Sequence, residues 1–513
     1  MILPLVHSLN RLAPREHSLS LLWVFHVLLC FFGIVGVAQE SKPVLHFETV
    51  LQSVTSQYPP YLAALIERDI AQGHLRSTKG AFDFETFAKV FQNPTGFYES
   101  TTVEAGFEQF TGIWGSTVFG SYRWTDGLLP DYYSERRTDR SGTPSLGFKL
   151  PLLRDGSIDK RRAAIAKAKL EVELVNPVIQ RQRLDFVKAS ASAYLNWMKA
   201  GKNLQIAEQM LELATLRTNA IQTRIDKGLS APVVSLENRQ MVVSRQMSLI
   251  KARRAFESAS ITLSLFLRDI DDAPVKPVRE QLPQTWPELV TVPEDILSTA
   301  WKYASVHRPE IRYYNLEMLK LGVDSELFQN QLNPRLDAYV AASQSQGQSL
   351  YKDTGEFELK LGFEFRMPLE RNAAKGAVQA NEANIEQLER SIGFAIEKIF
   401  TEIEDSYSAL RAAKDHMTLA VENKNLASNL RGIEADRFRW GATNLLSLQI
   451  REQTAFKANQ SLIDARYNYY KALTGFLIAS AVDFRESDEV SPVLWTLASG
   501  LMISSQPNLL PQN

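Results

Sequence analysis

Apolar residues recur every three or four positions along two long stretches of the chain, roughly 155–227 and 372–440, and this spacing predicts two very long helices. At a rise of about 1.5 Å per residue, each would be roughly 100 Å long. The repeating positions are Ala200, Leu204, Ala207, Leu211, Ala214, Thr218, Ile221 and Ile225 in the first stretch, Ile396, Ile403, Leu410 and Met417 in the second, and Leu236, Val243 and Ile250 in a further helix. Steps of three, four and seven are typical of coiled-coil seams, which need partner helices along their whole length.

Alternation of apolar and polar residues predicts β-strands between these helices. From Phe357 to Phe365 every second residue is Phe or Leu, and the residues between them are mostly charged. Further candidate strands lie at 81–90, 102–110, 115–125, 143–151 and 332–345. One face of such strands would be apolar and the other polar. This pattern fits a half-buried strand of a soluble protein, and it equally fits a transmembrane strand between lipid and water.

Three sequence anchors occur twice, which indicates a duplicated unit. Tyr58-Pro59 corresponds to Arg308-Pro309-Glu310-Ile311, the Leu-Gly-Phe at 146–148 corresponds to that at 361–363, and Gly228 corresponds to Gly441. The first unit carries roughly 35 additional residues before its Leu-Gly-Phe. These residues would form one more hairpin or an extended loop.

The repeat divides the chain into a first unit at 43–268, a Pro-rich linker at 269–292, a second unit at 293–480 and a C-terminal tail at 481–513. Each unit would hold a helix of moderate length (43–78 and 293–332), a β-hairpin region (81–151 and 334–368), a long helix, a glycine and another helix. Two hairpins per chain give about four strands, whereas a single-chain outer-membrane barrel needs at least eight. Because unpaired strand edges are not tolerated in lipid, a membrane-spanning role would require several copies to share one barrel.

The N-terminal segment has the pattern of a secretory signal. Residues 19–38 are apolar, Arg11 and Arg15 precede them, and Gly36 and Ala38 are small. We expect residues 1–38 to be a signal peptide cleaved after Ala38; an uncleaved membrane anchor is the alternative. The chain's one cysteine, Cys30, lies inside this segment, so the mature protein would contain no disulfide.

Composition and motifs argue against several classes of function. The chain has 57 Lys and Arg against 58 Asp and Glu, a balance that is unusual for a nucleic-acid-binding protein. It has no His-x-x-x-His pair, no Gly-x-Ser-x-Gly and no phosphate-binding loop with Lys-Ser or Lys-Thr. The acidic run Asp269, Asp271 and Asp272 lacks the turn glycine and the distal glutamate of a calcium loop. We therefore expect no enzymatic activity, no cofactor and no metal, and any work must be driven by a partner.

The signal segment, the duplicated order of strands, long helix, glycine and helix, and the anchors above together resemble the TolC-type outer-membrane channel family (outer-membrane factors). A segment of the last helix, Ala465-Arg466-Tyr467-Asn468-Tyr469, is also similar to a sequence motif of that family. The resemblance covers roughly 43–480. It implies a mainly α fold with a transmembrane β part, in which three copies form an α-helical barrel continuous with a shared 12-strand β-barrel.

The same resemblance implies a location in the cell outer membrane with a large periplasmic extension. It implies docking through a periplasmic adaptor (membrane fusion) protein to an inner-membrane pump of the RND or ABC type. The chain would then be a passive duct for efflux or for type I secretion, and neither the exported substrate nor the pump class follows from the sequence. The alternative is a periplasmic coiled-coil scaffold or an adhesin stalk with a soluble β head.

Members of this family often carry acidic residues six and nine positions after the glycine, where they ring the periplasmic constriction. The corresponding positions here are Ser447 and Ile450 in the second unit and Val234 and Glu237 in the first, so one carboxylate remains and an acidic, cation-binding ring is not expected. Arg451 and Glu452 are nearby charges that could pair with neighbouring helices and hold the closed state, or simply lie on a solvated helix face. The gate candidates are therefore Glu237, Ser447, Ile450, Arg451 and Glu452, and the expected hairpin-tip contacts for an adaptor are Gly228 and Gly441.

Overall fold

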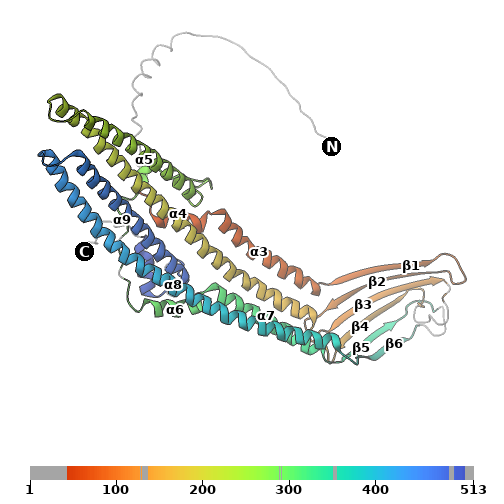
Figure 1. Ribbon diagram of the computed structural model, residues 1–513. Helices are drawn as coiled ribbons and strands as arrows, with labels where there is room; N and C mark the ends of the chain where they lie inside the picture. Colours follow the sequence, from red (N-terminus) through yellow and green to blue (C-terminus); the bar gives the residue numbers. More distant parts are fainter. Residues whose placement is uncertain are drawn as a thin grey trace, which may run out of the picture. The chain divides into compact units, whose positions relative to one another are not determined.

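The computed structural model describes residues 43–127, 129, 137–287, 289–290, 292–349, 355–484 and 490–502. All of its described helices and strands belong to one compact unit, Leu45–Asn513 (Figure 1). The expected signal peptide at 1–38 lies outside the described residues, as does the last part of the tail, 503–513. None of the helices in the described ranges combines the length and the apolar composition needed to cross a membrane.

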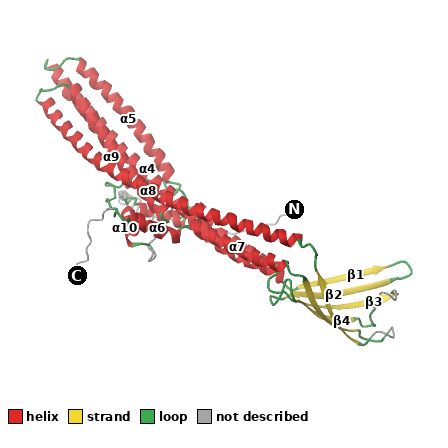
Figure 2. Cartoon of the chain, turned by 60° about the horizontal axis from the view of Figure 1, so that its bottom comes forward, coloured by secondary structure: helices red, strands yellow, loops and turns green. Residues whose placement is uncertain are grey.

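Four long helices form two helical hairpins. The first hairpin consists of α4 (Lys160–Asp226) and α5 (Val233–Leu263), and the second consists of α8 (Asn372–Arg439) and α9 (Leu445–Ala479). Helix α4 packs on α9, so that the order across this part of the molecule is α5, α4, α9, α8 (Figures 1 and 2). The two long helices expected from the apolar spacing are thus present, and Pro177 lies inside α4 without ending it.

The expected seams explain the contacts of the two long helices. On α4, Ala200, Leu204, Ala207, Ala214 and Ile221 are buried, and on α8, Ile403, Leu410 and Met417 are buried. Alanine at many of these positions lets the helix backbones approach closely. The seam on α5 behaves differently, because Leu236, Val243 and Ile250 are exposed.

Each unit begins with two helices rather than the single helix expected at 43–78 and at 293–332. Helix α2 (Phe47–Ser56) is followed by α3 (Pro59–Lys79), and α6 (Ile296–His307) is followed by α7 (Pro309–Gln331). The break has the same cause in both units: a residue that precedes proline is pushed out of the helical region. Tyr58 and Arg308 accordingly have ψ of 115° and 122°, and the proline that follows occupies the first turn of the next helix.

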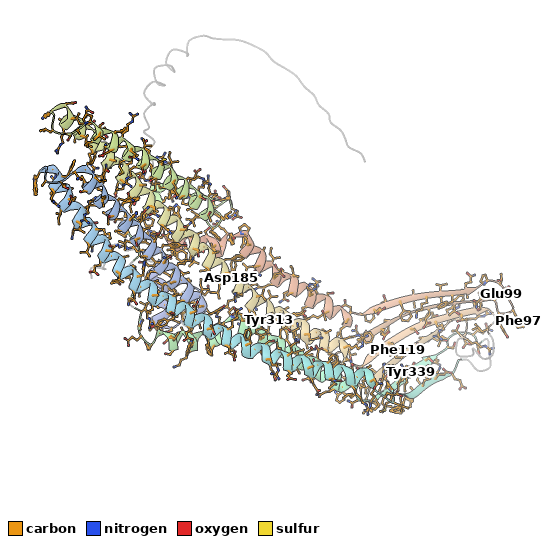
Figure 3. The ribbon with its side chains drawn as sticks, in the orientation of Figure 1. Phe97, Glu99, Phe119, Asp185, Tyr313 and Tyr339 are labelled. Atoms are coloured by element: carbon orange, nitrogen blue, oxygen red, sulfur yellow. The ribbon has the colours of Figure 1, made fainter. Side chains whose placement is uncertain are left out.

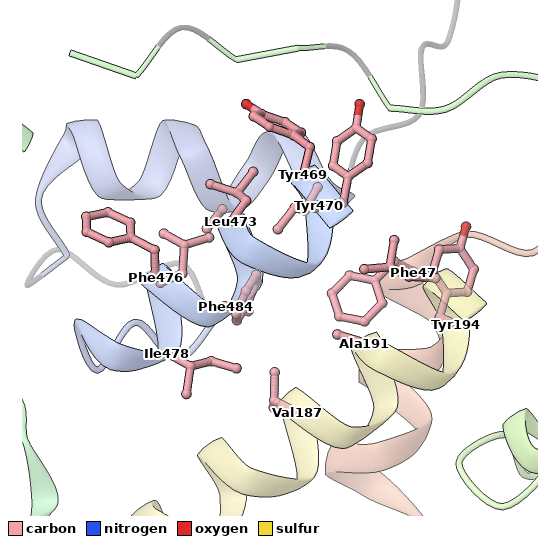
Figure 4. Packing of buried hydrophobic residues seen from close by; sticks show 14 of the residues in the cluster. Phe47, Val187, Ala191, Tyr194, Tyr469, Tyr470, Leu473, Phe476, Ile478 and Phe484 are labelled. Carbon is pink, nitrogen blue, oxygen red and sulfur yellow. The ribbon is translucent and has the colours of Figure 1, made fainter. Parts of the chain in front are cut away.

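The main hydrophobic core surrounds the middle of α4 and the end of α9, and we call it the middle core. Helices α2 and α6 contribute to it, as does α10 (Pro492–Met502) from the C-terminal tail. Figure 4 shows Phe47, Val187 and Phe476 within this cluster. The expected linker also folds onto it: it contains a short 3-10 helix, η3 (Arg279–Gln281), and it buries Leu282 and Trp286.

Three tyrosines hydrogen-bond other segments to the middle core. The hydroxyl of Tyr194 donates to the carbonyl of Leu45 at 3.0 Å, that of Tyr469 donates to the carbonyl of Val290 at 3.3 Å, and that of Tyr470 donates to the carbonyl of Pro287. Burial raises the pKa of all three hydroxyls above the usual value of 10. The linker and the start of the unit are therefore held to the long helices by neutral phenol groups.

The sheet has six antiparallel strands in sequence order, whereas the sequence reasoning counted about four per chain. The strands are β1 (Glu85–Asn93), β2 (Ser100–Phe110), β3 (Thr117–Gly127), β4 (Thr143–Pro151), β5 (Arg335–Gln344) and β6 (Phe357–Arg366). Three copies contributing all six strands would supply eighteen, so the twelve-strand total no longer follows from the chain.

The additional strands come from the residues that distinguish the two units. In the second unit β5 starts directly after α7, which ends at Gln331; in the first unit α3 ends at Lys79 and β3 starts only at Thr117. The intervening segment forms a short 3-10 helix, η1 (Gly80–Phe82), and the β1–β2 hairpin. The extra residues are thus a hairpin, as one of the two sequence alternatives proposed.

Candidate functional site

The sheet has one apolar face. Residues that stand opposite each other on antiparallel strands project from the same face, so the pairing register assigns each side chain to a side. The apolar face carries Ala88, Val90, Val103, Ala105, Phe107, Val118, Tyr122, Trp124, Leu146, Phe148, Leu150, Leu336, Ala338, Val340, Ala342, Phe357, Leu359, Leu361, Phe363 and Phe365. On β6 the five side chains of this face are 56–75% exposed. A surface of this size and composition is suited to lipid or to another apolar partner.

The opposite face of the sheet is polar and holds ion pairs both between neighbouring strands and within β5. Arg123 on β3 pairs with Glu104 on β2 at 3.4 Å, and Asp337 on β5 pairs with Lys149 at 3.0 Å and with Arg335 at 2.8 Å. A hollow of about 980 Å³ lies on this face, against the residues that lead into α4. Charged groups on one face and aliphatic or aromatic groups on the other are the arrangement of a wall between water and lipid.

Exposed aromatic side chains mark both ends of the sheet. Phe97, in the β1–β2 turn, is 81% exposed and packs edge-on against Tyr98 (Figure 3). Ile113 and Trp114, in the β2–β3 turn at the end nearer the helices, are also exposed. Strands of 9 to 11 residues have the length needed to cross a bilayer, and aromatic residues are enriched where such strands meet the membrane surfaces.

The helical hairpins end in the same turn at Gly228 and Gly441. The N–H of Gly228 donates to the carbonyl of Ile225 at 2.8 Å, and the next N–H donates to the carbonyl of Arg224 at 2.8 Å; the corresponding bonds of Gly441 and Ala442 measure 3.1 and 2.8 Å. This is the Schellman motif, which requires a left-handed residue after the helix. Both glycines have it, with φ of +71° and +74°. They are exposed at the hairpin tips, where they were expected.

The five gate candidates lie within about four helical turns of these tips, but they do not form one cluster. Glu237 on α5 and Ile450 and Arg451 on α9 are exposed. Ser447 is half-buried in the first turn of α9, where its N–H donates to the Asn444 side chain at 2.9 Å. Only Glu452 is buried. The solvated-face interpretation is therefore wrong for Glu452, although Arg451 is exposed as that interpretation expects.

Glu452 joins the two helical hairpins through an ion pair with Arg217 on α4. Both side chains are 11% exposed. Arg245 on α5 lies beside them, 5.4 Å from the centre of the Phe456 ring. Burial lowers the pKa of the Arg245 guanidinium, the Glu452 carboxylate raises it, and Arg217 lowers it. Glu452 thus pairs with one largely buried cation, Arg217, and its charge also acts on a second, Arg245.

Sequence reasoning missed Arg217 and Arg245. Neither residue belongs to a motif, and both lie in seam-bearing helices where a charge would be expected to face solvent. Asn238 was also missed: it is buried on α5, and its side-chain amide donates to the carbonyl of Ala214 at 3.3 Å and to Thr218 at 3.0 Å. The contacts of these three residues become visible only once α4, α5 and α9 are known to be neighbours.

The two helical hairpins form one layer in the order α5, α4, α9, α8, which we call the hairpin layer. Its two outer helices, α5 and α8, carry exposed apolar stripes. On α5, Leu229 in the preceding turn and then Leu236, Val243 and Ile250 follow one another at seven-residue intervals and are 48–67% exposed. On α8, Leu419, Leu426 and Ile433, and then Trp440 at its end, have the same interval and are 57–79% exposed. These are coiled-coil seams without a partner among the described residues of the chain.

Comparison with known proteins supports this interpretation of the geometry. The family model of the outer membrane efflux protein matches residues 116–267 and 304–476. Among solved structures, the outer membrane channel CmeC of Campylobacter jejuni shares 12% identity, with a TM-score of 0.59 and coverage of 89% of each chain. The outer membrane protein VceC of Vibrio cholerae shares 14% identity, with a TM-score of 0.59 and coverage of 85% of this chain and 96% of that one.

The open-state MtrE outer membrane channel of Neisseria gonorrhoeae shares 12% identity, with a TM-score of 0.60 and coverage of 85% of this chain and 89% of that one. No curated protein matches the sequence. The expected resemblance to TolC-type channels is confirmed, and the alternative of a periplasmic scaffold or adhesin stalk is not supported. The chain belongs to the outer membrane efflux protein family and is an outer-membrane channel component of an efflux system.

Proposed function

We propose that three copies of this chain assemble into one passive duct, with a helical barrel in the periplasm and a shared β-barrel in the outer membrane. The two units, residues 43–268 and 293–480, would contribute equivalent helical hairpins to its wall. An adaptor protein would contact the tips at Gly228 and Gly441, and an inner-membrane pump of the RND or ABC type would drive efflux or type I secretion. The chain itself would perform no catalysis.

The observation that carries this proposal is the match between the two exposed apolar stripes. Helix α5 runs away from its tip and α8 runs toward its tip, so the two helices are antiparallel when copies stand side by side. Leu229 of one copy then lies beside Trp440 of the next, and every further step of seven residues brings together another pair, ending with Ile250 and Leu419. Helices α5 and α8 are the outer members of the hairpin layer (Figure 1), so each is free to meet a neighbouring copy.

The magnitude of this contact favours a stable assembly. Fully burying one large aliphatic or aromatic side chain contributes about 1.5–3 kcal/mol. Eight such side chains meet at each junction between copies in the proposed packing. A closed ring of identical junctions leaves none of these stripes exposed, which is the reason to prefer a ring over an open dimer.

Disulfide crosslinking tests the assembly. The variant V243C/L426C, made with Cys30 replaced by Ser, should give linked dimers and trimers under oxidising conditions because Val243 and Leu426 are expected to face each other. The matched control is V243C/N425C, since Asn425 is exposed but lies about 100° further around α8. A detergent-solubilised protein that remains monomeric by light scattering, with no linked species, would contradict the proposal.

We further propose that the gate lies near the hairpin tips and that the Arg217–Glu452 pair keeps it closed. The pair lies roughly 10–15 Å from the tips, because Glu452 comes seven residues after the start of α9 and Arg217 nine residues before the end of α4. It connects α4 to α9, so the two hairpins cannot separate without breaking it. Ser447, Ile450, Arg451 and Glu237 are nearer to the tips and are proposed to line or approach the aperture.

A further inference from the structure

The β1–β2 hairpin continues the two-faced pattern of the other strands. Ala88 and Val90 extend the apolar face, and Lys89 and Glu104 extend the polar face, where Glu104 pairs with Arg123 at 3.4 Å. Strand β2 pairs with β3 along its whole length, 100–110 against 117–127. The family model matches the chain only from residue 116 onward, so this hairpin lies before the first matched segment. In a loop outside the membrane, nothing would select for an apolar and a polar face that are continuous with those of the sheet.

The pairing of the strands decides which edges are free. Strand β3 is hydrogen-bonded on both sides, by β2 and by β4, so that it offers no edge to another copy. The edges of the sheet are β1 and β6, and nearly every residue of these two strands is exposed, in contrast to the strands between them. Backbone N–H and C=O groups at a free edge cannot remain unpaired in lipid. The two edges therefore need a partner, and each is a suitable partner for the other.

In one register between β1 and β6, the side chains of the two edges fit each other. On the polar face, the Phe87 ring lies so close to Gly106 that a Cβ there would be 2.8 Å from it, and the Phe119 ring covers Gly147 in the same way. Gly362 on β6 has open space at this position, and Phe91 on β1 is 63% exposed. Placing Phe91 of one copy opposite Gly362 of the next repeats the ring-over-glycine contact.

The same register matches the charges and the apolar residues of the two edges. It sets Lys89 opposite Glu364, a pair of opposite sign, and it sets Phe87 opposite Arg366, which allows a cation–π contact. On the other face, Val90 stands opposite Phe363 and Ala88 opposite Phe365. Shifting the register by four residues would instead place Glu85 opposite Glu364, and directly opposed like charges are destabilising.

We propose that β1 of one copy pairs with β6 of the next, so that three copies build a wall of eighteen strands in which the β1–β2 hairpin is a full member. This inference rests on the trimeric assembly proposed above. Because barrel diameter grows roughly linearly with strand number, the pore through the membrane would be about 1.5 times as wide as that of a twelve-strand barrel. The partner recognised by each sheet edge is thus a second copy of this chain.

Crosslinking across the predicted edge tests the register. The variant K89C/E364C, with Cys30 replaced by Ser, should be converted by mild oxidation mostly into linked dimers and trimers, because opposed residues on antiparallel strands have the Cα separation that a disulfide requires. The control K89C/E358C places its second cysteine on the same face of β6, six residues away, and should stay unlinked. A trimer that shows equal linkage in both variants, or linkage only in the control, would overturn the register.

The number of strands in a cross-section of the purified, unmodified trimer, counted by electron cryomicroscopy in detergent, tests the wall itself. Eighteen strands support the proposal. Twelve strands in a trimer would overturn it and leave the proposed function intact, because β1 and β2 would then lie outside the wall. A particle with no three-fold symmetry would instead contradict the proposed trimer.

Discussion

Replacing Glu452 by Gln should shift the channel toward its open state. The substitution keeps the size of the side chain but removes the carboxylate that pairs with Arg217 and whose charge also acts on Arg245, and both arginines are largely buried. Removing one partner of a buried ion pair costs about 3–5 kcal/mol, since the other charge is left uncompensated. If the pair exists only while the two hairpins are in contact, this free energy is lost from the closed state. A change of about 3 kcal/mol alters the ratio of closed to open channels by roughly 150-fold.

Single-channel recording in planar bilayers measures this ratio directly. The Glu452→Gln variant is expected to show a much higher open probability than the unmodified protein at neutral pH. The matched control is Glu257→Gln, which makes the same chemical change at an exposed position of α5 far from the tip and should leave the open probability unchanged. A Glu452→Gln channel that opens no more often than the unmodified one, in a trimer of unchanged mass, would refute the role of the pair in closure.

Three further outcomes follow from particular residues. Gly441→Ala should destabilise the hairpin tip by about 1–2 kcal/mol, because Ala disfavours a left-handed backbone, whereas Gly432→Ala, inside α8 and seven residues before its end, should stabilise its helix by up to about 1 kcal/mol; hydrogen exchange at the tip distinguishes the two. Burial raises the pKa of Tyr470, so its contribution to stability is present below pH 10 and should fall above it by up to about 1.4 kcal/mol per pH unit; thermal unfolding of the unmodified protein and of Tyr470→Phe should diverge in that range. Crosslinking Ser447→Cys or Glu237→Cys between copies should block export in cells, and unchanged export after complete crosslinking would remove these residues from the gate.

The helical part of the fold was predictable because its signals are local. Steps of three, four and seven residues identify a seam wherever its partner lies, so the long helices ending near Asp226 and Arg439 follow from the sequence alone. The breaks at Tyr58 and Arg308 were equally local, since a proline follows each of them, but those prolines were used only as repeat anchors. The seam on α5 was recognised as needing a partner, and the structure shows that this partner is not another described helix of the same chain.

The strand count and the charge cluster could not be derived in the same way. Alternation reveals the two faces of a strand but not which strand it pairs with, so candidate strands at 81–90 and 102–110 could be a separate hairpin, a loop or part of the sheet. Arg217 and Glu452 are 235 positions apart, and nothing in either local sequence indicates that α4 lies against α9. The number of strands in the sheet and the Arg217–Glu452 contact both depend on the tertiary arrangement, which local sequence does not reveal.

Both ends of the described unit are fixed at the middle core rather than at the sheet or the hairpin tips. The N–H of Leu45 donates to the carbonyl of Gln281 at 2.9 Å, and Met502 packs at the end of α10 against the same cluster. A fluorescent protein or an affinity tag joined next to Leu45 or Met502 would therefore be attached at the middle core, away from both the sheet and the hairpin tips. The molecule can thus be labelled or anchored to a surface for transport measurements without plugging the passage under study.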